Sequence, residues 1–313
     1  MEKLPPSTLL KFNPNQMNEV RKAFNLDDLK KLEQALDHFE DWIKMQNHFA
    51  VKEFDRDYLE RFLIANKGSV EIAKKRLDKL CTLRTMMPDF LRNFDVTNEL
   101  PRMIKWMHAC VLPQPTKDNY RVLATMVHDP EAVDYIDFIG YYRFYISIVE
   151  YLFKYDYNAG YEVIFDTRQF SLSVVSKLSP IAVKNCTTIF LEALAFRLKR
   201  LHIISGSKLF DFVMSIIKQA LTEKLVKRIV IHDDPSTLQQ YIPKEMLPVD
   251  FGGTETSMKE LCEANVNEFC TEEHIARLKK MEAAVSDESK RLSYKFNEEH
   301  LGLPGSFKTL CVD

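Results

Sequence analysis

Glycine is scarce in this chain, with 8 residues among 313. Proteins built on glycine-rich phosphate loops or on tight hairpins normally carry more. The sequence contains none of the patterns G-x-x-x-x-G-K-[ST], G-x-G-x-x-G, G-x-S-x-G and H-E-x-x-H, which mark nucleotide, nucleophile and zinc sites. No set of nucleophile, base and orienting group can be assembled from its motifs. We therefore expect that the protein is not an enzyme.

Long apolar runs are also missing. The longest stretch without Asp, Glu, Lys or Arg is Trp106–Thr116, which contains two prolines, whereas a membrane span needs about 20 apolar residues. The N-terminus lacks the basic and apolar segments of a signal peptide. The six cysteines form no C-x-x-C pair, which favours reduced thiols over disulfides or zinc. These absences predict a cytoplasmic protein with no transmembrane segment, no cofactor and no metal.

Charge of one sign is not in excess, because 43 Lys and Arg oppose 45 Asp and Glu, for a net charge of −2. A chain held on nucleic acid by bulk charge is thereby excluded, and we expect no nucleic-acid partner. Aromatic residues are plentiful, with 21 Phe and 12 Tyr. Such a surplus indicates either a large core or a cavity lined for an apolar guest.

The first hundred residues show helical periodicity after a proline-containing arm at residues 1–15. Apolar residues recur at three- and four-residue spacing from about residue 18 to residue 49. Further helical stripes follow Asp55 and Ser69, which are suitable N-caps. This pattern predicts an N-terminal helical domain over residues 16–95.

Short apolar runs rich in β-forming residues appear after residue 100. They are Tyr120–Val127, Tyr161–Phe165, Arg200–Ser205 and Arg228–His232. Consecutive apolar residues are typical of strands buried on both faces, and the helical stretches between the runs predict parallel pairs with right-handed crossovers. We expect an α/β fold, with a mostly parallel sheet at residues 100–255. Charged helical patterns at about 256–269 and 271–296 then predict C-terminal helices and a tail over residues 256–313.

The helical stretch Phe138–Lys154 carries one narrow polar seam. Its polar residues Arg143, Ser147, Glu150 and Lys154 are spaced by 4, 3 and 4 positions, and apolar or aromatic residues surround them. A helix of this kind is mostly buried. The seam faces either water or a cavity in which it binds a ligand, and periodicity alone leaves both open.

A basic segment stands out in this nearly neutral chain. Residues 197–228 hold eight Lys or Arg against two acids. Arg197 and Lys199 point to the same side of an extended chain, and Lys224, Lys227 and Arg228 share one helical face. These two groups flank the apolar helical stretch Leu209–Leu221. The arrangement suits a phosphorylated headgroup or an anionic membrane, although a solvated charged surface has the same pattern.

An ordered series of motifs carries a family resemblance. The segments are Tyr58–Leu63, Gly160–Asp166, Pro180, Arg197–Ile204, Leu221–Leu225, Ile242–Pro248 and Phe251–Gly253. The series resembles the CRAL-TRIO lipid-binding family, in the branch of alpha-tocopherol transfer protein and cellular retinaldehyde-binding protein. The resemblance implies a lipid cage with a helical lid, which binds one hydrophobic molecule without catalysis.

The resemblance also implies which residues form the sites. The phosphoinositide-binding positions fall on Arg197, Lys199, Lys224 and Arg228. The lid falls on Leu209–Leu221. The positions that line the cage fall on Arg143, Phe144, Ser147, Phe165, Ile189, Phe190, Leu194, Leu201, Phe210, Val213, Met214 and Ile217.

Two departures from the family pattern bear on the ligands. The family's second phosphate-binding arginine is Asn66 here, with Lys67 as the nearest substitute. Arg143 replaces a serine of the cage. A guanidinium needs a polar partner when it is buried, so an inward Arg143 would predict a ligand with a carboxylate, aldehyde or hydroxyl end.

Three functional interpretations follow. The first is a carrier that moves a retinoid, tocopherol, carotenoid or similar isoprenoid between membranes, with peripheral attachment to phosphoinositide-containing surfaces. The second is a phosphoinositide-dependent adaptor or signalling protein regulated by lipid occupancy. The third is an enzyme that uses Arg143 and Glu150.

Overall fold

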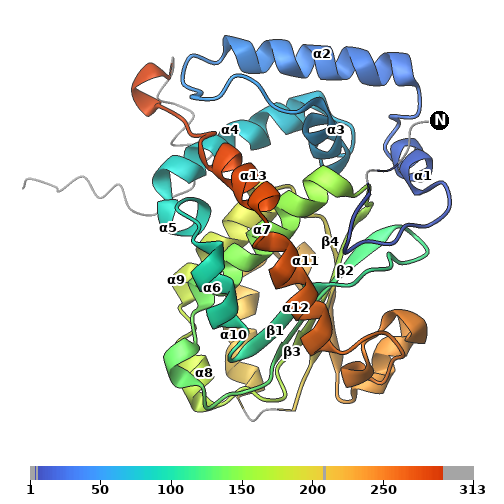
Figure 1. Ribbon diagram of the computed structural model, residues 1–313, viewed down its shortest axis with the longest axis vertical. Helices are drawn as coiled ribbons and strands as arrows, with labels where there is room; N and C mark the ends of the chain where they lie inside the picture. The colour runs from blue at the N-terminus through green and yellow to red at the C-terminus, as the bar shows by residue number, and fades with distance from the viewer. Residues whose placement is uncertain (1–3, 5, 207–208, 292–313) are drawn as a thin grey trace, which may run out of the picture.

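The N-terminal part of the chain folds into helices, as the periodicity predicts (Figure 1). A computed structural model describes residue 4 and residues 6–206 and 209–291. The helices before the sheet are α1 (Gln16–Ala23), α2 (Leu29–Met45), α3 (Arg56–Ala65), α4 (Val70–Met86), α5 (Pro88–Leu91) and α6 (Val96–Met103). Asp28 and Ser69 cap α2 and α4 through their side chains, whereas Asp55 precedes α3 without a side-chain cap.

The periodic stretch from residue 18 to residue 49 is two helices rather than one. Helix α1 ends at Ala23, and Asn25 adopts a left-handed φ of 58° that interrupts the helix. The carboxylate of Asp28 then accepts hydrogen bonds from the backbone N–H groups of Lys30 and Lys31, at 3.0 and 3.3 Å. Periodicity does not register this break, because the apolar stripe continues across it.

A five-stranded sheet follows, and it confirms the predicted α/β fold. Its strands are β1 (Met107–Val111), β2 (Tyr120–Val127), β3 (Gly160–Asp166), β4 (Leu198–Ile204) and β5 (Ile229–His232), in the spatial order β1-β2-β3-β4-β5. Strands β2 to β5 run parallel, and β1 pairs antiparallel with β2. The sequence prediction included the four parallel strands and missed β1, which lies inside the charge-free stretch Trp106–Thr116.

Helices connect the parallel strands and follow the sheet. They are α7 (Phe138–Tyr155), α8 (Leu172–Ser176), α9 (Pro180–Thr187), α10 (Phe210–Ala220), α11 (Glu223–Val226), α12 (Met258–Phe269) and α13 (Glu272–Glu282). A π-helical turn, Thr188–Ala193, continues α9. Among the helices of the described ranges, none combines the length and the apolar character that crossing a bilayer requires.

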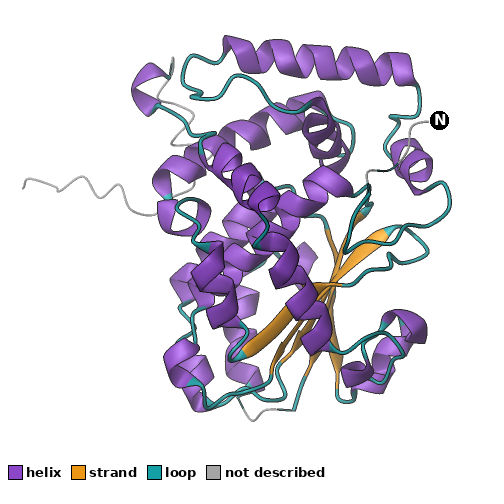
Figure 2. Ribbon diagram, viewed as in Figure 1, coloured by secondary structure: helices purple, strands orange, loops and turns teal. Residues whose placement is uncertain are grey.

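Both faces of the sheet are largely buried at β1 to β3, which explains the continuous apolar runs in these strands, whereas Ile231 of the edge strand β5 is 51% exposed. One face carries Leu123, Val163 and Leu201, which are register partners and pack on the side of α7. The other face carries Ala124 and Ile164, which pack under the segment 235–261. Figure 2 shows most helices gathered on the first side and the short helical turns of the second side at the lower right.

Two terminal segments differ from the sequence prediction. The arm before α1 is packed rather than loose: Leu9 and Leu10 are buried, and the Ser7 hydroxyl lies 2.8 Å from the hydroxyl of Tyr151. The second C-terminal helix ends at Glu282 rather than continuing to residue 296. The chain then returns along α4, where the Arg291 guanidinium donates two hydrogen bonds of 2.8 Å to Asp78. The last residues of the predicted helix, 292–296, lie outside the described residues.

A buried ion pair joins the sheet to the end of α7. The Arg121 guanidinium on β2 donates to both carboxylate oxygens of Asp156 at 2.7 and 3.0 Å, and both side chains are 0% exposed. The same guanidinium donates to the backbone oxygens of Lys11 and Pro113. One cation therefore fixes the N-terminal arm, the β1–β2 connection and the helix end.

We predict that Asp156→Ala lowers the free energy of unfolding by about 3–5 kcal/mol, because it leaves the Arg121 charge buried without its partner. Urea denaturation followed by circular dichroism measures the change. Glu263→Ala, which removes an exposed partner of Lys259 at 3.9 Å, is the control and should change stability little. Equal effects of the two substitutions would contradict the assignment of Arg121–Asp156 as the central pair.

Candidate functional site

An apolar cavity of about 200 Å³ lies between α7, α9, the sheet and the inner side of α10. Its walls are formed by Tyr141, Tyr142, Tyr145, Val163, Val183, Cys186, Thr187, Phe190, Leu191, Phe196, Leu198, Leu201, Ile217 and Leu221. These residues come from segments that are up to 80 positions apart in the sequence. The cavity is therefore a product of the tertiary fold and of no single motif.

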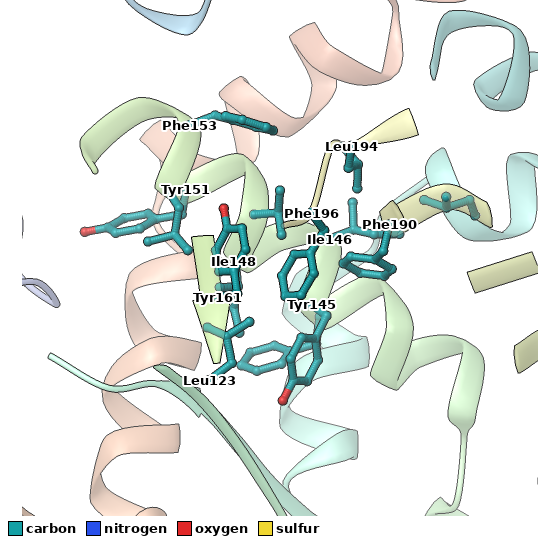
Figure 3. Packing of buried hydrophobic residues seen from close by; sticks show 14 of the residues in the cluster. Leu123, Tyr145, Ile146, Ile148, Tyr151, Phe153, Tyr161, Phe190, Leu194 and Phe196 are labelled. Atoms are coloured by element: carbon teal, nitrogen blue, oxygen red, sulfur yellow. The ribbon is translucent and has the colours of Figure 1, made fainter. Parts of the chain in front are cut away.

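The strands supply the floor of the cavity. Val163 on β3 and Leu201 on β4 are register partners, so their side chains lie together on one sheet face. Aromatic rings close one side: Phe190 meets Phe196 edge-on at 5.6 Å between ring centroids, and Phe196 stacks on Tyr161 at 4.0 Å. Figure 3 shows Tyr145, Phe190 and Phe196 gathered beside α7.

Close approach of the chain requires a glycine at the start of β3. Gly160 has a φ of 142°, and a Cβ atom there would lie 2.6 Å from the backbone oxygen of Arg197. The absence of a side chain allows the Tyr161 N–H to donate to that same oxygen at 2.9 Å. This contact sets the beginning of β4 against β3, beside the cavity.

Helix α10 lies within the segment for which the resemblance implies a lid. The predicted segment Leu209–Leu221 contains α10, whose residues Val213, Met214 and Ile216 are buried while Phe212 is 54% exposed. Ile217 and the following Leu221 contribute directly to the cavity wall. The helix thus presents apolar side chains both inward and outward, which is unusual for a surface helix.

The structure brings only some of the predicted cage residues into the cavity wall. Phe190, Leu201 and Ile217 line it. Phe165, Ile189, Leu194, Val213 and Met214 are buried or half-buried in the surrounding core instead. The side chain of Phe210 lies outside the described residues.

Three residues of the polar seam of α7, Arg143, Ser147 and Glu150, are buried and lie outside the cavity wall, whereas Lys154 at its end is partly exposed. The predicted placement of Arg143 in the cage is wrong. The Arg143 guanidinium donates to the backbone oxygens of Asp89 at 3.0 Å and Asn93 at 2.5 Å, and it pairs with Glu99 at 2.8 Å. It also lies 4.5 Å above the Phe94 ring. These partners belong to the α5–α6 region, so Arg143 serves as a joint between α7 and the N-terminal helices.

The neighbours of Arg143 on α7 also contact other protein groups. The Ser147 hydroxyl donates to the backbone oxygen of Arg143 at 3.1 Å, and Phe144 packs on Phe269 of α12 at 5.6 Å between centroids. Neither lines the cavity, contrary to the prediction.

The lower part of the seam is paired in the same manner. The Glu150 carboxylate receives a 3.1 Å hydrogen bond from Arg84, and Lys154 pairs with Glu273. Burial raises the pKa of Glu150, with the Arg84 charge acting against it. Arg143 and Glu150 therefore form structural ion pairs with different partners, and they do not provide a shared catalytic site.

Sequence reasoning missed the tyrosines that face the cavity. Tyr141 and Tyr145 are four positions apart on α7, with Tyr142 beside them. The signal was present as an i, i+4 pair of amphipathic aromatic residues. Both tyrosines were assigned to the apolar face of the helix, because tyrosine counts as a hydrophobic residue when hydrophobic periodicity is measured.

The predicted phosphoinositide cations gather where β4 begins. Burial and the neighbouring charges of Arg228 and Arg76 lower the pKa of Arg197. The Arg197 guanidinium lies 4.1 Å from the centroid of the Phe24 ring, and Arg228 donates to the backbone oxygen of Leu198. Arg197 therefore lies near two further arginines, of which Arg76 has the Glu192 carboxylate as a neighbouring counter-charge.

The lysines of the predicted set extend the cluster outward. Lys199 is exposed, with its ammonium 5.1 Å from the Tyr120 ring centroid, and Lys224 is exposed on α11. Asn66 does not substitute for the missing arginine: it is buried, and its amide donates to the Phe62 oxygen at 2.8 Å. Lys67, which follows it with a left-handed φ of 58°, is exposed.

Other polar clusters of the described ranges do not provide a metal site. No group of three His, Cys, Asp or Glu side chains gathers there in a suitable arrangement. His232 bonds to His202 at 3.0 Å and to the Thr237 hydroxyl at 2.7 Å, and His202 bonds to Glu162 at 3.1 Å. This chain of side chains is buried on the sheet face opposite the cavity.

Family models match two parts of the chain. The model of the CRAL/TRIO domain matches residues 105–253, and that of the Pinta-like UBA domain matches residues 28–100. A segment of 96 residues, 30% of this chain, is 31% identical to "Alpha-tocopherol transfer protein-like" of Mus musculus and covers 28% of that protein. A match of 96 residues is 31% identical to "Clavesin-1" of Rattus norvegicus and covers 27% of it. The matched segment thus spans less than a third of each relative. The structure of Sfh5 superposes with a TM-score of 0.49 at 16% identity, over 87% of this chain and 98% of that chain.

We predict that Arg143→Leu lowers the free energy of unfolding by about 1–3 kcal/mol, because Glu99 and two backbone oxygens lose their donor. It should leave the preference for any bound lipid unchanged. Thermal and urea denaturation measure the first effect, and displacement of a fluorescent lipid measures the second. Arg102→Leu, which removes an exposed arginine of α6, is the control for lost charge. If the substitution changes the lipid preference and leaves stability unaltered, the result would indicate that Arg143 contacts the lipid in the cavity.

Proposed function

We propose that this chain, whose residues 105–253 match the CRAL/TRIO domain, binds one hydrophobic lipid in the apolar cavity and transfers it between membranes. The observation that carries the proposal is the cavity itself, whose wall is completed by Ile217 of the lid helix α10. The names of the matched relatives include a tocopherol transfer protein-like protein. The proposed ligand is a retinoid, tocopherol, carotenoid or similar isoprenoid.

Burial of the lipid replaces its contacts with the bilayer. Each square ångström of apolar surface removed from water contributes about 25 cal/mol, so the apolar wall compensates for leaving the membrane. The cavity of about 200 Å³ is smaller than typical pockets for drug-sized ligands, which measure about 300–1,000 Å³. Entry of an isoprenoid therefore requires outward movement of α10.

Exposed apolar side chains on three helices support contact with a membrane. Phe212 on α10 is 54% exposed, Leu172 on α8 is 72% exposed and Ile181 on α9 is 73% exposed. Helix α10 packs against α9. Large apolar side chains beside a lid suit insertion into the headgroup and acyl boundary of a bilayer, where opening would release the lipid without exposing it to water.

The basic cluster of Arg197, Lys199, Lys224 and Arg228 supports attachment to phosphoinositide headgroups. Arginines form paired, charge-assisted hydrogen bonds with phosphate oxygens, and lysines near an anionic surface each contribute about 1 kcal/mol. An anion bound here would supply a counter-charge to Arg197, whose pKa is lowered by burial and by the nearby Arg228. We propose that this attachment holds the protein at the membrane while the lid opens.

A cavity-filling substitution tests lipid binding. Val183→Phe should abolish the lipid that copurifies with the protein, because the added ring occupies the space between α9 and the sheet. Solvent extraction and mass spectrometry identify and quantify the lipid. Ile72→Phe, at an exposed position of α4, is the control and should retain it. A stoichiometric isoprenoid supports the carrier, a phospholipid supports the adaptor interpretation, and the absence of lipid binding by the unaltered protein contradicts the proposal.

A charge-reversal pair tests membrane attachment. Lys199→Glu with Lys224→Glu should reduce binding to vesicles that contain phosphoinositides by at least tenfold at physiological salt, with the melting temperature nearly unchanged. Both lysines are exposed, so only the surface charge is altered. Lys30→Glu with Lys279→Glu makes the same change of net charge elsewhere on the exposed surface and should reduce binding much less. Equal losses of vesicle binding in the two double variants would contradict a specific site and would indicate non-specific attraction between the protein and the anionic membrane.

A further inference from the structure

We propose that strand β5 is an interface at which the protein pairs with a second copy of itself. The two β5 strands run antiparallel about a two-fold axis at Val230, so that the two sheets become one. This inference goes beyond the proposed lipid transfer and does not depend on it.

Strand β5 ends the sheet with one edge directed away from it. It is the last strand in the spatial order, and β4 is its neighbour. In a parallel ladder, alternate residues direct both backbone groups to the neighbouring strand. The backbone oxygens of Arg228 and His232 accept hydrogen bonds from N–H groups on the β4 side, at 3.0 and 2.9 Å. Ile229 and Ile231 therefore direct their N–H and C=O groups away from β4.

These outward backbone groups have no hydrogen-bond partner in the part of the chain that the structure describes. A row of unpaired N–H and C=O groups on an edge strand is a template for a further strand. Proteins block such an edge with a proline, a bulge or a covering segment. The strand Ile229–His232 contains no proline, and its register with β4 is regular. Its edge can therefore accept another strand.

Exposed apolar side chains lie beside the edge on both faces of the sheet. Ile231 is 51% exposed on the face that also carries Ile203, its register partner on β4. On the other face Tyr241 is 38% exposed, and its ring meets the His232 ring edge-on at 5.8 Å between centroids. A strand added to β5 would remove both side chains from water, which favours association.

The charges at the two ends of β5 select a second copy as the partner. Lys227 precedes the strand, and Asp233 and Asp234 follow it, all with exposed side chains. A parallel copy would place like charges side by side, which is destabilising. An antiparallel copy places the cation at the start of each strand beside the acids at the end of the other, and opposite charges across a strand pair are stabilising.

The outward groups also determine the register of the pair. In an antiparallel ladder, residues that exchange both of their hydrogen bonds lie directly opposite each other. Ile229 then lies opposite Ile231 of the second copy at two symmetric places, and Val230 lies on the two-fold axis. In this register Lys227 is opposite Asp233 of the second copy. The contact is isologous, so it closes as a dimer and does not grow into a fibre.

Charge reversal with rescue tests the interface in the full chain. Sedimentation velocity between about 1 and 100 µM should show a monomer–dimer equilibrium. Lys227→Asp and Asp233→Lys each place like charges together at both ends, and each should weaken the dimer at least fivefold. The variant with both substitutions regains opposite charges and should dimerise within about twofold of the unaltered protein. An equimolar mixture of the two single variants should also dimerise, because each copy then meets the opposite charge at both ends.

Lys259→Asp, which reverses an exposed lysine of α12, is the control and should leave the dimerisation constant unchanged. A chain that stays monomeric at about 100 µM would overturn the inference. So would a dimer that neither single reversal weakens, or a double variant that remains as weak as the single variants. Each of these outcomes is independent of whether a lipid is bound.

A cross-link tests the position of the axis. The Cα atoms of a non-hydrogen-bonded antiparallel pair are about 4.5 Å apart, which is within the range of a disulfide. Oxidised Val230→Cys should therefore form a covalent dimer on a non-reducing gel. Ile231→Cys lies opposite residue 229 and should cross-link much less, while the unaltered protein reports the background from its six cysteines. Equal cross-linking of the two variants would contradict the axis at Val230.

Discussion

Helix α7 is buried on nearly every side, and the rest of the structure depends on how its polar groups are satisfied. Arg143 and Glu150 face the N-terminal helices, where Glu99 of α6 and Arg84 of α4 pair with them. The opposite side of the helix presents Tyr141, Tyr142 and Tyr145 to the cavity. Buried charges require partners, so the charged seam can only be placed against protein. The uncharged aromatic side of α7 is therefore the side that faces the cavity. The low polarity of the cavity follows from the ion pairs on the other side of the helix.

The same separation of charge operates at the surface. The arginines near the start of β4 repel one another, and Arg197 is kept half-buried by Phe24 and the chain around it. Burial and the nearby charge of Arg228 both disfavour the charged form of Arg197. Helix α10 and its exposed Phe212 follow the other end of that strand, which ends at Ile204.

The sequence allowed much of the fold to be predicted, because burial on both faces leaves continuous apolar runs. Tyr120–Val127 was predicted with its observed bounds. Strand β1 was missed since its five residues lie in a charge-free stretch that contains two prolines, with no turn signal before it. The break between α1 and α2 was missed because a left-handed Asn25 leaves no mark on hydrophobic periodicity. Local sequence patterns thus predicted the strands that are buried along their whole length. They failed where a single backbone angle ends a helix.

The candidate site was less predictable, for a physical reason. Whether a polar residue on a buried helix faces a cavity or another helix depends on the partners that tertiary packing supplies. Arg143 and Tyr141 are two positions apart and point to different environments, which periodicity cannot distinguish without knowledge of their surroundings. Arg143 was the most conspicuous polar residue in the sequence of this helix. A buried charge, however, requires a partner within the protein. The residues left to face the cavity are therefore the weakly polar tyrosines, which carry no charge that the fold would have to pair.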